Sequence, residues 1–189
     1  NAKDGKVIQT IIDNKGIVYI TDPINNRIKK WNKTSWTTDK YLDTLSNITS
    51  ITCDSNGNLY ASKLIFSKFQ PVKSIVKKWD GNKWIVLGNA FENPIGLQIS
   101  TMCTDKIGNI YVAGDIKNDS NSFYVAKWNG TEWRELGGLN SLKANKRITN
   151  ISIDKNWNLY ADGSFTNSNG KFYIAKWDGV NWSEIGSNN

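Results

Sequence analysis

Histidine is absent from the 189-residue sequence, and cysteine occurs only twice, at Cys53 and Cys103. Histidine is the commonest general base and a principal zinc ligand, so its absence argues against imidazole catalysis and against a zinc site. Two cysteines are too few for a disulfide framework. We predict that both are small buried residues.

Long apolar runs and nucleotide-binding motifs are also missing. No run approaches the about 20 apolar residues that span a bilayer, and no P-loop, GxGxxG or GxSxG motif occurs. No secretory signal pattern is present, but the chain begins at Asn1 rather than Met, as a processed form or a fragment does. We therefore expect no enzyme, no metal and no cofactor, and the missing signal leaves the compartment open.

The charge balance is basic, with 24 Lys and Arg against 17 Asp and Glu, a net charge of +7. Such an excess suits nucleic acid, an anionic glycan or an acidic partner. No run of five or more basic residues appears, so we interpret the excess as a lysine-rich solvated surface. Nucleic acid is not favoured as a partner.

Tryptophan is abundant, with nine residues, and eight of them recur in pairs. Each pair begins with a Lys-Trp dipeptide and ends five residues later, and a turn sequence such as Asp-Gly or Asn-Gly lies between. The first members are Trp31, Trp79, Trp128 and Trp177, and the second members are Trp36, Trp84, Trp133 and Trp182. Their spacing of 48 or 49 residues identifies four copies of one unit.

An aspartate marks a second recurring position, before each Lys-Trp. The four are Asp13, Asp54, Asp105 and Asp154. Each is followed by a tight turn and then by an apolar residue and a tyrosine, and aspartate at such a position accepts hydrogen bonds from backbone N–H groups. Because these Trp and Asp residues recur in every copy, we interpret them as structural; a repeated ligand site, one per unit, is the other interpretation.

The alternating apolar pattern predicts four short strands in each unit, A to D. A single four-stranded meander cannot cover both of its faces, whereas copies stacked around an axis can. We therefore predict an all-β fold, a β-propeller of four antiparallel blades of about 48 residues over residues 1–189. The predicted blades cover approximately residues 7–41, 47–89, 98–138 and 147–187. Three arrangements stay open: a closed four-bladed ring, part of a larger ring, and two chains that together complete a ring.

The string G-N-I-Y-V-A-G-D…Y-V-A-K-W-N-G-T-E-W-R-E-L-G, residues 108–137, carries a family resemblance. It resembles the propeller repeats of many bacterial secreted and surface proteins, with units of the form D-x-x-G-N-x-Y…K-W-[DN]-G-x-x-W-x-x-[LI]-G. The resemblance implies a propeller fold, and it favours a secreted or cell-surface location without fixing the compartment. Repeat number resembles hemopexin-like propellers and repeat length resembles tachylectin-type lectins, but neither family's own motifs occur, so no ligand residues carry over.

Two of the four connections in each unit are variable, and they share one face. The A–B and C–D turns are tight in every copy, whereas the B–C and D–A connections differ in length and composition. Variable loops on a rigid scaffold are the usual place for recognition. The candidate binding residues are Ile65, Phe66, Lys68 and Phe69 in one insertion, and Lys143, Lys146 and Arg147 in a basic cluster. The alternative for the insertion is that it extends strands B and C and packs on a neighbouring blade, and for the basic cluster we favour a solvated loop over an anion site.

These observations lead to three hypotheses about function. The first is a non-catalytic interaction module that recognises a protein partner through the variable loop face. The second is a lectin-type propeller that binds carbohydrate between blades, and the third and most remote is a glycoside hydrolase. Loops that diverge from copy to copy favour the protein partner over a multivalent lectin.

Overall fold

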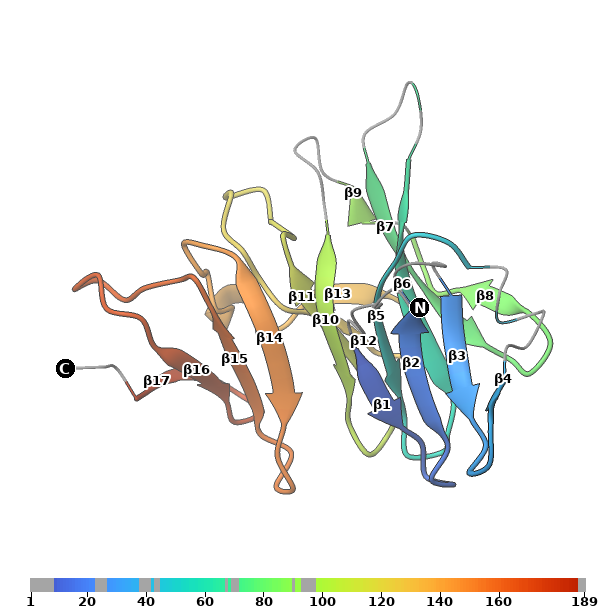
Figure 1. Ribbon diagram of the computed structural model, residues 1–189. Coiled ribbons are helices and arrows are strands. Elements are labelled where there is room, and N and C mark those ends of the chain that lie inside the picture. The colour runs from blue at the N-terminus through green and yellow to red at the C-terminus, as the bar shows by residue number, and fades with distance from the viewer. Residues whose placement is uncertain are drawn as a thin grey trace, which may run out of the picture.

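The computed structural model describes residues 9–22, 27–37, 42, 45–66, 68, 72–89, 91–92 and 98–186. These residues form four antiparallel sheets that follow one another along the chain (Figure 1). Within each sheet, strands that are neighbours in space are also neighbours in sequence, as short hairpins require. We call the sheets blades 1 to 4.

The strands of each blade are as follows. Blade 1 contains β1 (Thr10–Ile12), β2 (Val18–Asp22), β3 (Arg27–Trp31) and β4 (Trp36–Thr37). Blade 2 contains β5 (Ile48–Cys53), β6 (Leu59–Ile65), β7 (Lys73–Trp79) and β8 (Trp84–Val86), with the short β9 (Phe91–Glu92) paired to β7. Blade 3 contains β10 (Ile99–Thr104), β11 (Ile110–Gly114), β12 (Ala126–Trp128) and β13 (Trp133–Glu135). Blade 4 contains β14 (Ile148–Ile153), β15 (Leu159–Gly163), β16 (Ile174–Trp177) and β17 (Trp182–Ile185).

The recurring aspartate organises the turn between the first two strands of each blade. In blade 2, Asp54 Oδ1 accepts hydrogen bonds from the backbone N–H groups of Asn56 and Asn58, both at 2.9 Å. The same pair of bonds recurs in the other three blades. The turn needs a left-handed residue, which is Gly57 in blade 2 (φ 80°) and Trp157 in blade 4 (φ 69°). Side-chain anchoring by the aspartate is therefore common to all four turns, whereas glycine is not.

The two tryptophans of each unit lie opposite one another on the outer hairpin of the blade. Trp128 pairs in register with Trp133, and their ring centroids are 5.4 Å apart. The other three pairs have centroid distances of 5.3 to 5.6 Å and a similar tilt. Such cross-strand aromatic contacts stabilise a hairpin beyond the burial of their area.

The hydrophobic core consists of three separate layers, one in each seam between consecutive blades. The layer between blades 3 and 4 shows the pattern: Tyr111 and Val125 come from blade 3, and Ile151, Leu159 and Ala161 come from blade 4. Equivalent layers fill the seams between blades 1 and 2 and between blades 2 and 3. Blades 2 and 3 therefore each use one face for the blade before them and the other for the blade after them.

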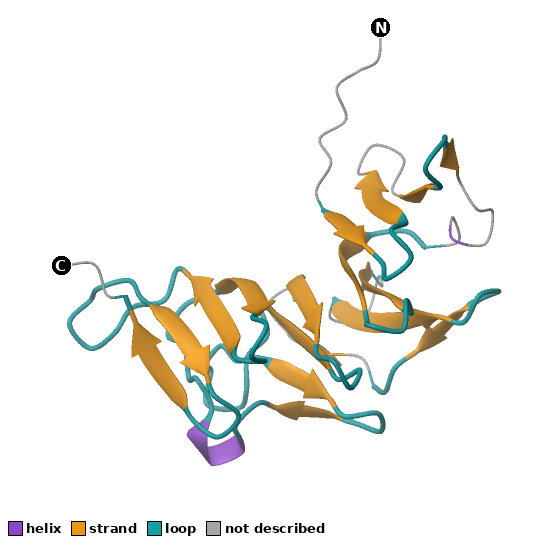
Figure 2. Ribbon diagram, turned by 90° about the horizontal axis from the view of Figure 1, so that it is seen from below, coloured by secondary structure: helices purple, strands orange, loops and turns teal. Residues whose placement is uncertain are grey.

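Seen in Figure 2, the four blades form an open arc, and the described strands of blades 1 and 4 lie far apart. The inner strands β1, β5, β10 and β14 contact one another in that order along the inside of the arc. This architecture confirms the predicted all-β propeller of four four-stranded blades. Among the described residues, no helix has the length and apolar character needed to cross a membrane.

Candidate functional site

A hydrogen-bonded Asp–Tyr pair lies at the tight-turn end of every blade. The hydroxyl of Tyr60 donates to Asp54 Oδ2 at 2.9 Å, and the corresponding bonds in blades 1, 3 and 4 measure 3.4, 3.0 and 2.9 Å. The lysine of the Lys-Trp dipeptide lies over the tyrosine ring, with Lys78 Nζ 5.8 Å from the Tyr60 centroid. The recurring aspartate is thus bonded to the tyrosine in all four blades, and the recurring lysine covers that ring in blades 2, 3 and 4.

The pKa values of these groups follow from the bonds. Burial and the Asp13 carboxylate raise the pKa of Tyr19 to about 12. Burial opposes ionisation of Asp54, but hydrogen bonds from Asn58, Tyr60 and Asn56 outweigh it and lower the pKa of that carboxyl. At neutral pH Asp54 is therefore ionised, and because burial and Asp54 raise the pKa of Tyr60, that tyrosine stays protonated, which is the state in which their bond holds.

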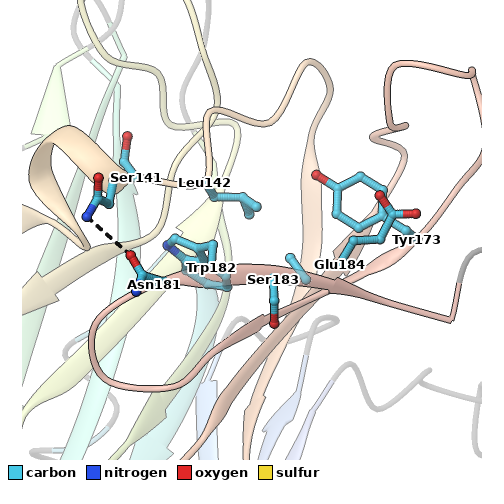
Figure 3. A pocket seen from close by; sticks show the side chains of 9 residues that line it. Ser141, Leu142, Tyr173, Asn181, Trp182, Ser183 and Glu184 are labelled. Atoms are coloured by element: carbon cyan, nitrogen blue, oxygen red, sulfur yellow. Dashed lines mark hydrogen bonds between the residues drawn. The ribbon is translucent and has the colours of Figure 1, made fainter.

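A pocket of about 350 Å³ opens in the seam between blades 3 and 4 (Figure 3). One wall is the segment after blade 3, which includes the short 3₁₀ helix η2 (Gly138–Asn140) and ends at Leu142. The other wall is the outer hairpin of blade 4. We call this the Trp182 pocket; its lining residues are Asn140, Ser141, Leu142, Tyr173, Ala175, Asn181, Trp182, Ser183 and Glu184.

Aromatic and polar groups alternate along the Trp182 pocket. Figure 3 shows Asn181 and Ser141 at one end and Tyr173 with Glu184 at the other, and Trp182 lies between them, beside Asn181. Asn140 Nδ2 donates to Asn181 Oδ1 at 3.3 Å, which ties the two walls together. The indole Nε1 of Trp182 is buried and has no hydrogen-bond partner, whereas the equivalent Trp133 Nε1 donates to the Leu87 carbonyl at 2.8 Å.

The electrostatics of the pocket are those of a single exposed carboxylate among neutral groups. Glu184 Oε1 accepts a hydrogen bond from Asn167 Nδ2 at 2.8 Å, which fixes the carboxylate against the loop of blade 4. Burial and the nearby Glu184 raise the pKa of Tyr173, so the phenol remains a hydrogen-bond donor. The pocket therefore offers hydroxyl and amide donors, one carboxylate acceptor and two aromatic rings.

This set of side chains is specific to two of the four blades. Blade 3 repeats the arrangement with Asn118, Tyr124, Trp133 and Glu135, and the Asn118 amide contacts both Glu135 oxygens at 3.1 and 3.2 Å. Blade 2 has Ile75 and Val86 at the tyrosine and glutamate positions. Sequence reasoning missed the set, although the shared Tyr and Glu spacing around the Trp pairs of blades 3 and 4 was a visible signal.

The hydrophobic insertion predicted as a binding site forms the far end of the β6–β7 hairpin. Ile65 and Phe66 are 38% and 61% exposed, and Lys68 is also exposed. The remaining candidate, Phe69, lies outside the described residues. The hairpin extends beyond the blade (Figure 1), so these side chains are separated from the Trp182 pocket.

The predicted basic cluster is divided by the structure. Lys143 and Lys146 are exposed on the loop after blade 3, whereas Arg147 is half-buried between blades 3 and 4. The Arg147 guanidinium donates to Ser100 Oγ at 2.5 Å and lies 3.5 Å from the Asp115 carboxylate. Arg147 therefore links the inner ends of the two blades, and the structure does not join the three residues in one anion site.

A metal centre is not evident in the part of the chain that the structure describes. No three Cys, Asp or Glu side chains there are close enough together to hold an ion. The two cysteines are free and half-buried, less enclosed than the buried positions predicted for them.

Comparisons with known proteins show the fold. No family model matches the sequence, and no curated protein matches it. Streptogramin B lyase is 17% identical with a TM-score of 0.63, and the alignment covers 100% of this chain and 57% of that one. The fucose-specific lectin of Aleuria aurantia is 15% identical (TM-score 0.61, coverage 96% and 60%), and the WD40 repeats of RRP9 are 9% identical (TM-score 0.60, coverage 98% and 52%).

These similarities establish that the chain has a β-propeller fold, and they do not assign it to a family. The chain spans little more than half the length of the three proteins just named. At identities of 9 to 17% the likeness concerns the fold alone. The resemblance to bacterial surface repeats therefore remains a prediction.

The comparisons overturn one expectation from the sequence. The absence of histidine and of nucleotide-binding or nucleophile motifs led us to expect that the chain is not an enzyme, and that exclusion is wrong. Both streptogramin B lyase and the virginiamycin B lyase of Staphylococcus aureus share this fold. Propellers of this kind include enzymes as well as lectins and WD40 repeats, so neither the motif search nor the fold excludes catalysis.

Proposed function

We propose that the chain binds carbohydrate in the Trp182 pocket. The observation that carries the proposal is the combination of Trp182 and Tyr173 with the Glu184 carboxylate and the Asn140–Asn181 amide pair in one open pocket. A volume of about 350 Å³ suits one or two sugar rings, since small-molecule pockets begin at about 300 Å³.

The chemistry of a sugar matches each kind of group. The C–H face of a pyranose is apolar and stacks on an indole or phenol ring, while its hydroxyls both donate and accept hydrogen bonds. Glu184 accepts from hydroxyls, and the amides of Asn140 and Asn181 donate and accept. A carboxylate with no lysine or arginine lining the pocket disfavours phosphate or sulfate, so a neutral sugar is the expected ligand.

Fixed geometry supports the same conclusion. Asn167 holds the Glu184 carboxylate at 2.8 Å, and the Asn140–Asn181 bond joins both walls before a ligand arrives. Polar groups that are positioned in the free protein lose less entropy on binding. The similar arrangement in blade 3 favours a second, related site there, while blade 2, with Ile75 and Val86, lacks the donors and acceptors.

Titration calorimetry with a panel of methyl glycosides, including the α-L-fucoside, tests the proposal. Glu184→Gln keeps the shape of the side chain and removes its charge, so it should raise the Kd of the recognised glycoside about tenfold or more. A tenfold rise corresponds to a loss of about 1.4 kcal/mol of binding free energy. Glu132→Gln, in the exposed turn of blade 3, is the matched control and should leave the affinity unchanged. Equal affinity of both variants, or no heat with any glycoside, would rule the pocket out as a sugar site.

We propose a protein partner for the β6–β7 hairpin as a second function. Ile65 and Phe66 are exposed at 38% and 61% beside Lys68, on a hairpin that extends beyond its blade. Exposed aromatic and aliphatic side chains next to positive charge are typical of an interface anchor.

A photo-crosslinking amino acid at position 66 tests this second proposal in cells of the source organism. A discrete crosslinked protein that disappears with Ile65→Ser is the expected result. The same amino acid at position 139 is the control, because Leu139 is 94% exposed but lies outside the hairpin. Identical crosslinks from both positions would indicate nonspecific contact and refute the proposal.

A further inference from the structure

A second pocket, of about 360 Å³, opens in the seam between blades 2 and 3. It lies at the tight-turn end of that seam and shares no lining residue with the Trp182 pocket. Its volume suits a small molecule, since ligand pockets begin at about 300 Å³. We call it the Gly108 pocket; blade 2 contributes Asp54, Asn56 and Lys78 to its lining, and blade 3 contributes Ile107, Gly108 and Trp128.

The glycine in the turn of blade 3 leaves this pocket open. Gly108 has a φ of 85°, and a Cβ there would have no neighbour nearer than Asp54 Oδ2, at 3.9 Å. The equivalent residue of blade 4 is Trp157, which is also left-handed (φ 69°). Lys106 Nζ of blade 3 lies 5.5 Å from the centroid of the Trp157 ring, so this indole lies against the preceding blade. Trp157 therefore fills in its seam the space that Gly108 leaves open.

The seam between blades 1 and 2 is filled at the same place by an asparagine. A Cβ on Gly57 would lie 2.7 Å from Asn14 Oδ1, and Asn14 Nδ2 donates to the Ser55 carbonyl at 2.9 Å. The residue of blade 2 that is equivalent to Asn14 is the shorter Ser55, whose hydroxyl donates to the Lys106 carbonyl at 3.1 Å. The seam between blades 2 and 3 thus lacks both the asparagine and the tryptophan that cover this position in the other two seams.

Ile107 places an exposed apolar side chain at the rim of the Gly108 pocket. It is 77% exposed. The equivalent residues of the other three units are all polar: Lys15, Asn56 and Asn156. Leu87 and Trp128 line the pocket deeper in the seam, where both belong to its apolar layer. A ligand with an apolar body would cover Ile107 and remove its surface from water.

Lys78 is the charged group of the pocket that remains able to bind a ligand. Asp54 already accepts four hydrogen bonds, from two backbone N–H groups, the Asn58 amide and the Tyr60 hydroxyl, which occupies the about four acceptor positions of a carboxylate. In the described part of the chain, the Lys78 ammonium and the Asn56 side-chain amide make no hydrogen bond, and Lys78 Nζ lies 5.8 Å from the Tyr60 centroid. An ammonium has three donors and no acceptor, so a ligand that binds it has to supply acceptors.

We propose that the Gly108 pocket binds a small organic carboxylate with an apolar body. The carboxylate accepts hydrogen bonds from the Lys78 ammonium and the Asn56 amide, and the apolar body packs against Ile107 and Trp128. A hydrogen bond between two ionised groups is stronger than one between neutral groups, so a neutral ligand of the same shape binds more weakly. The nearby negative charge of Asp54 disfavours a dianion such as phosphate.

Nuclear magnetic resonance of the Trp128 indole N–H group tests the class of ligand with three matched probes. Phenylacetate, phenylacetamide and phenethylamine share a phenyl ring and carry a negative, a neutral and a positive head group. The Trp128 signal, assigned with a Trp128→Phe variant, should shift with phenylacetate, while the signal of Trp36 on blade 1 should stay in place. The Kd of phenylacetamide should be about tenfold higher or more, because it lacks the charge.

Two variants test whether the probe binds in this pocket. Gly108→Trp introduces the residue that blade 4 has at the equivalent position, and it should abolish the phenylacetate-induced shift. Lys78→Met keeps the length of the side chain and removes the ammonium, so it should raise the Kd of phenylacetate about tenfold or more and leave that of phenylacetamide unchanged. Lys127→Met, at the equivalent lysine of blade 3, is the matched control and should change neither Kd.

The results that would overturn the proposal are distinct. No shift with any probe would show that the pocket binds none of these ligands, and tighter binding of phenethylamine than of phenylacetate would show that a cation is preferred. Unchanged phenylacetate binding in folded Gly108→Trp, or equal effects of Lys78→Met and Lys127→Met, would place the probe elsewhere. Far-ultraviolet circular dichroism shows whether each variant is folded, and Lys78→Met decides the question if Gly108→Trp does not fold.

Discussion

Replacing Tyr60 with phenylalanine isolates the contribution of the recurring Asp–Tyr bond. The hydroxyl donates to Asp54 Oδ2 at 2.9 Å, and both residues are buried, at 4% and 5% exposure. The substitution keeps the ring in its seam, where it packs in the layer between blades 2 and 3. What it removes is one hydrogen bond to a buried carboxylate.

The magnitude follows from the charge and the length of that bond. A hydrogen bond to an ionised group contributes about 1.5–3 kcal/mol, and Asp54 retains the Asn58 amide and two backbone donors after the change. We expect the free energy of unfolding to fall by about 2 kcal/mol. In a chain of this size that corresponds to a fall in Tm of roughly 4–8 °C.

Blade 1 supplies the internal control. The Tyr19 hydroxyl is 3.4 Å from Asp13 Oδ2, too long for a strong bond, so Tyr19→Phe should cost only about 0.5 kcal/mol. Urea unfolding followed by tryptophan fluorescence measures both variants. Equal losses from the two substitutions, or a loss below about 0.5 kcal/mol for Tyr60→Phe, would refute the argument from bond length and charge.

Three further predictions concern the backbone, acid and thiols. A Cβ on Gly114 would lie 2.1 Å from the Gln98 carbonyl oxygen, so Gly114→Ala should lower the free energy of unfolding by about 2 kcal/mol or more. Gly130→Ala is the control and should cost clearly less, because nothing lies within 4 Å of a Cβ at that position. Hydrogen bonds from Asn158, with burial opposing them, lower the pKa of Asp154 to about 2. The ionised carboxylate therefore stabilises the fold above the unfolded pKa near 4, and this stabilisation is lost as the pH falls towards 2. Because Asp154→Asn has no carboxylate to protonate, its Tm should fall less than the wild-type Tm over that pH range. Burial and Asp105 raise the pKa of Cys103 to about 12, so Cys103 should not react with a thiol reagent at pH 8 until urea unfolds the chain.

The sequence predicted the fold because its signals are local and repeated. The Asp turns, the Trp pairs and the two-residue alternation recur every 48 or 49 residues, and each one specifies a strand or a turn without reference to distant parts of the chain. Placing blades side by side then follows from the need to cover both faces of every sheet. The outcome for Phe69 stays open, since that residue lies outside the described residues.

The candidate site was harder to predict because it is assembled from two units. Asn140 follows blade 3, while Asn181 and Glu184 belong to the last hairpin of blade 4, and only the seam brings them together. The site residues were also missed because the search for residues that recur in all four units does not find residues that only blades 3 and 4 share. Arg147 shows a second limit of local sequence: it is close to Lys143 and Lys146 along the chain, but its side chain points into the seam toward Asp115 and Ser100.

Nuclear magnetic resonance of the indole N–H groups tests the central claim most directly. Each of the nine tryptophans gives one signal, and single Trp→Phe variants assign those of Trp182 and Trp133. Titration with the methyl glycosides should shift the Trp182 signal, followed by that of Trp133 if the second site is occupied, and leave the signal of Trp36 in place. Glycoside-induced shifts confined to tryptophans outside blades 3 and 4, or no shift at all, would contradict the proposal that the seam between those blades is a sugar-binding site.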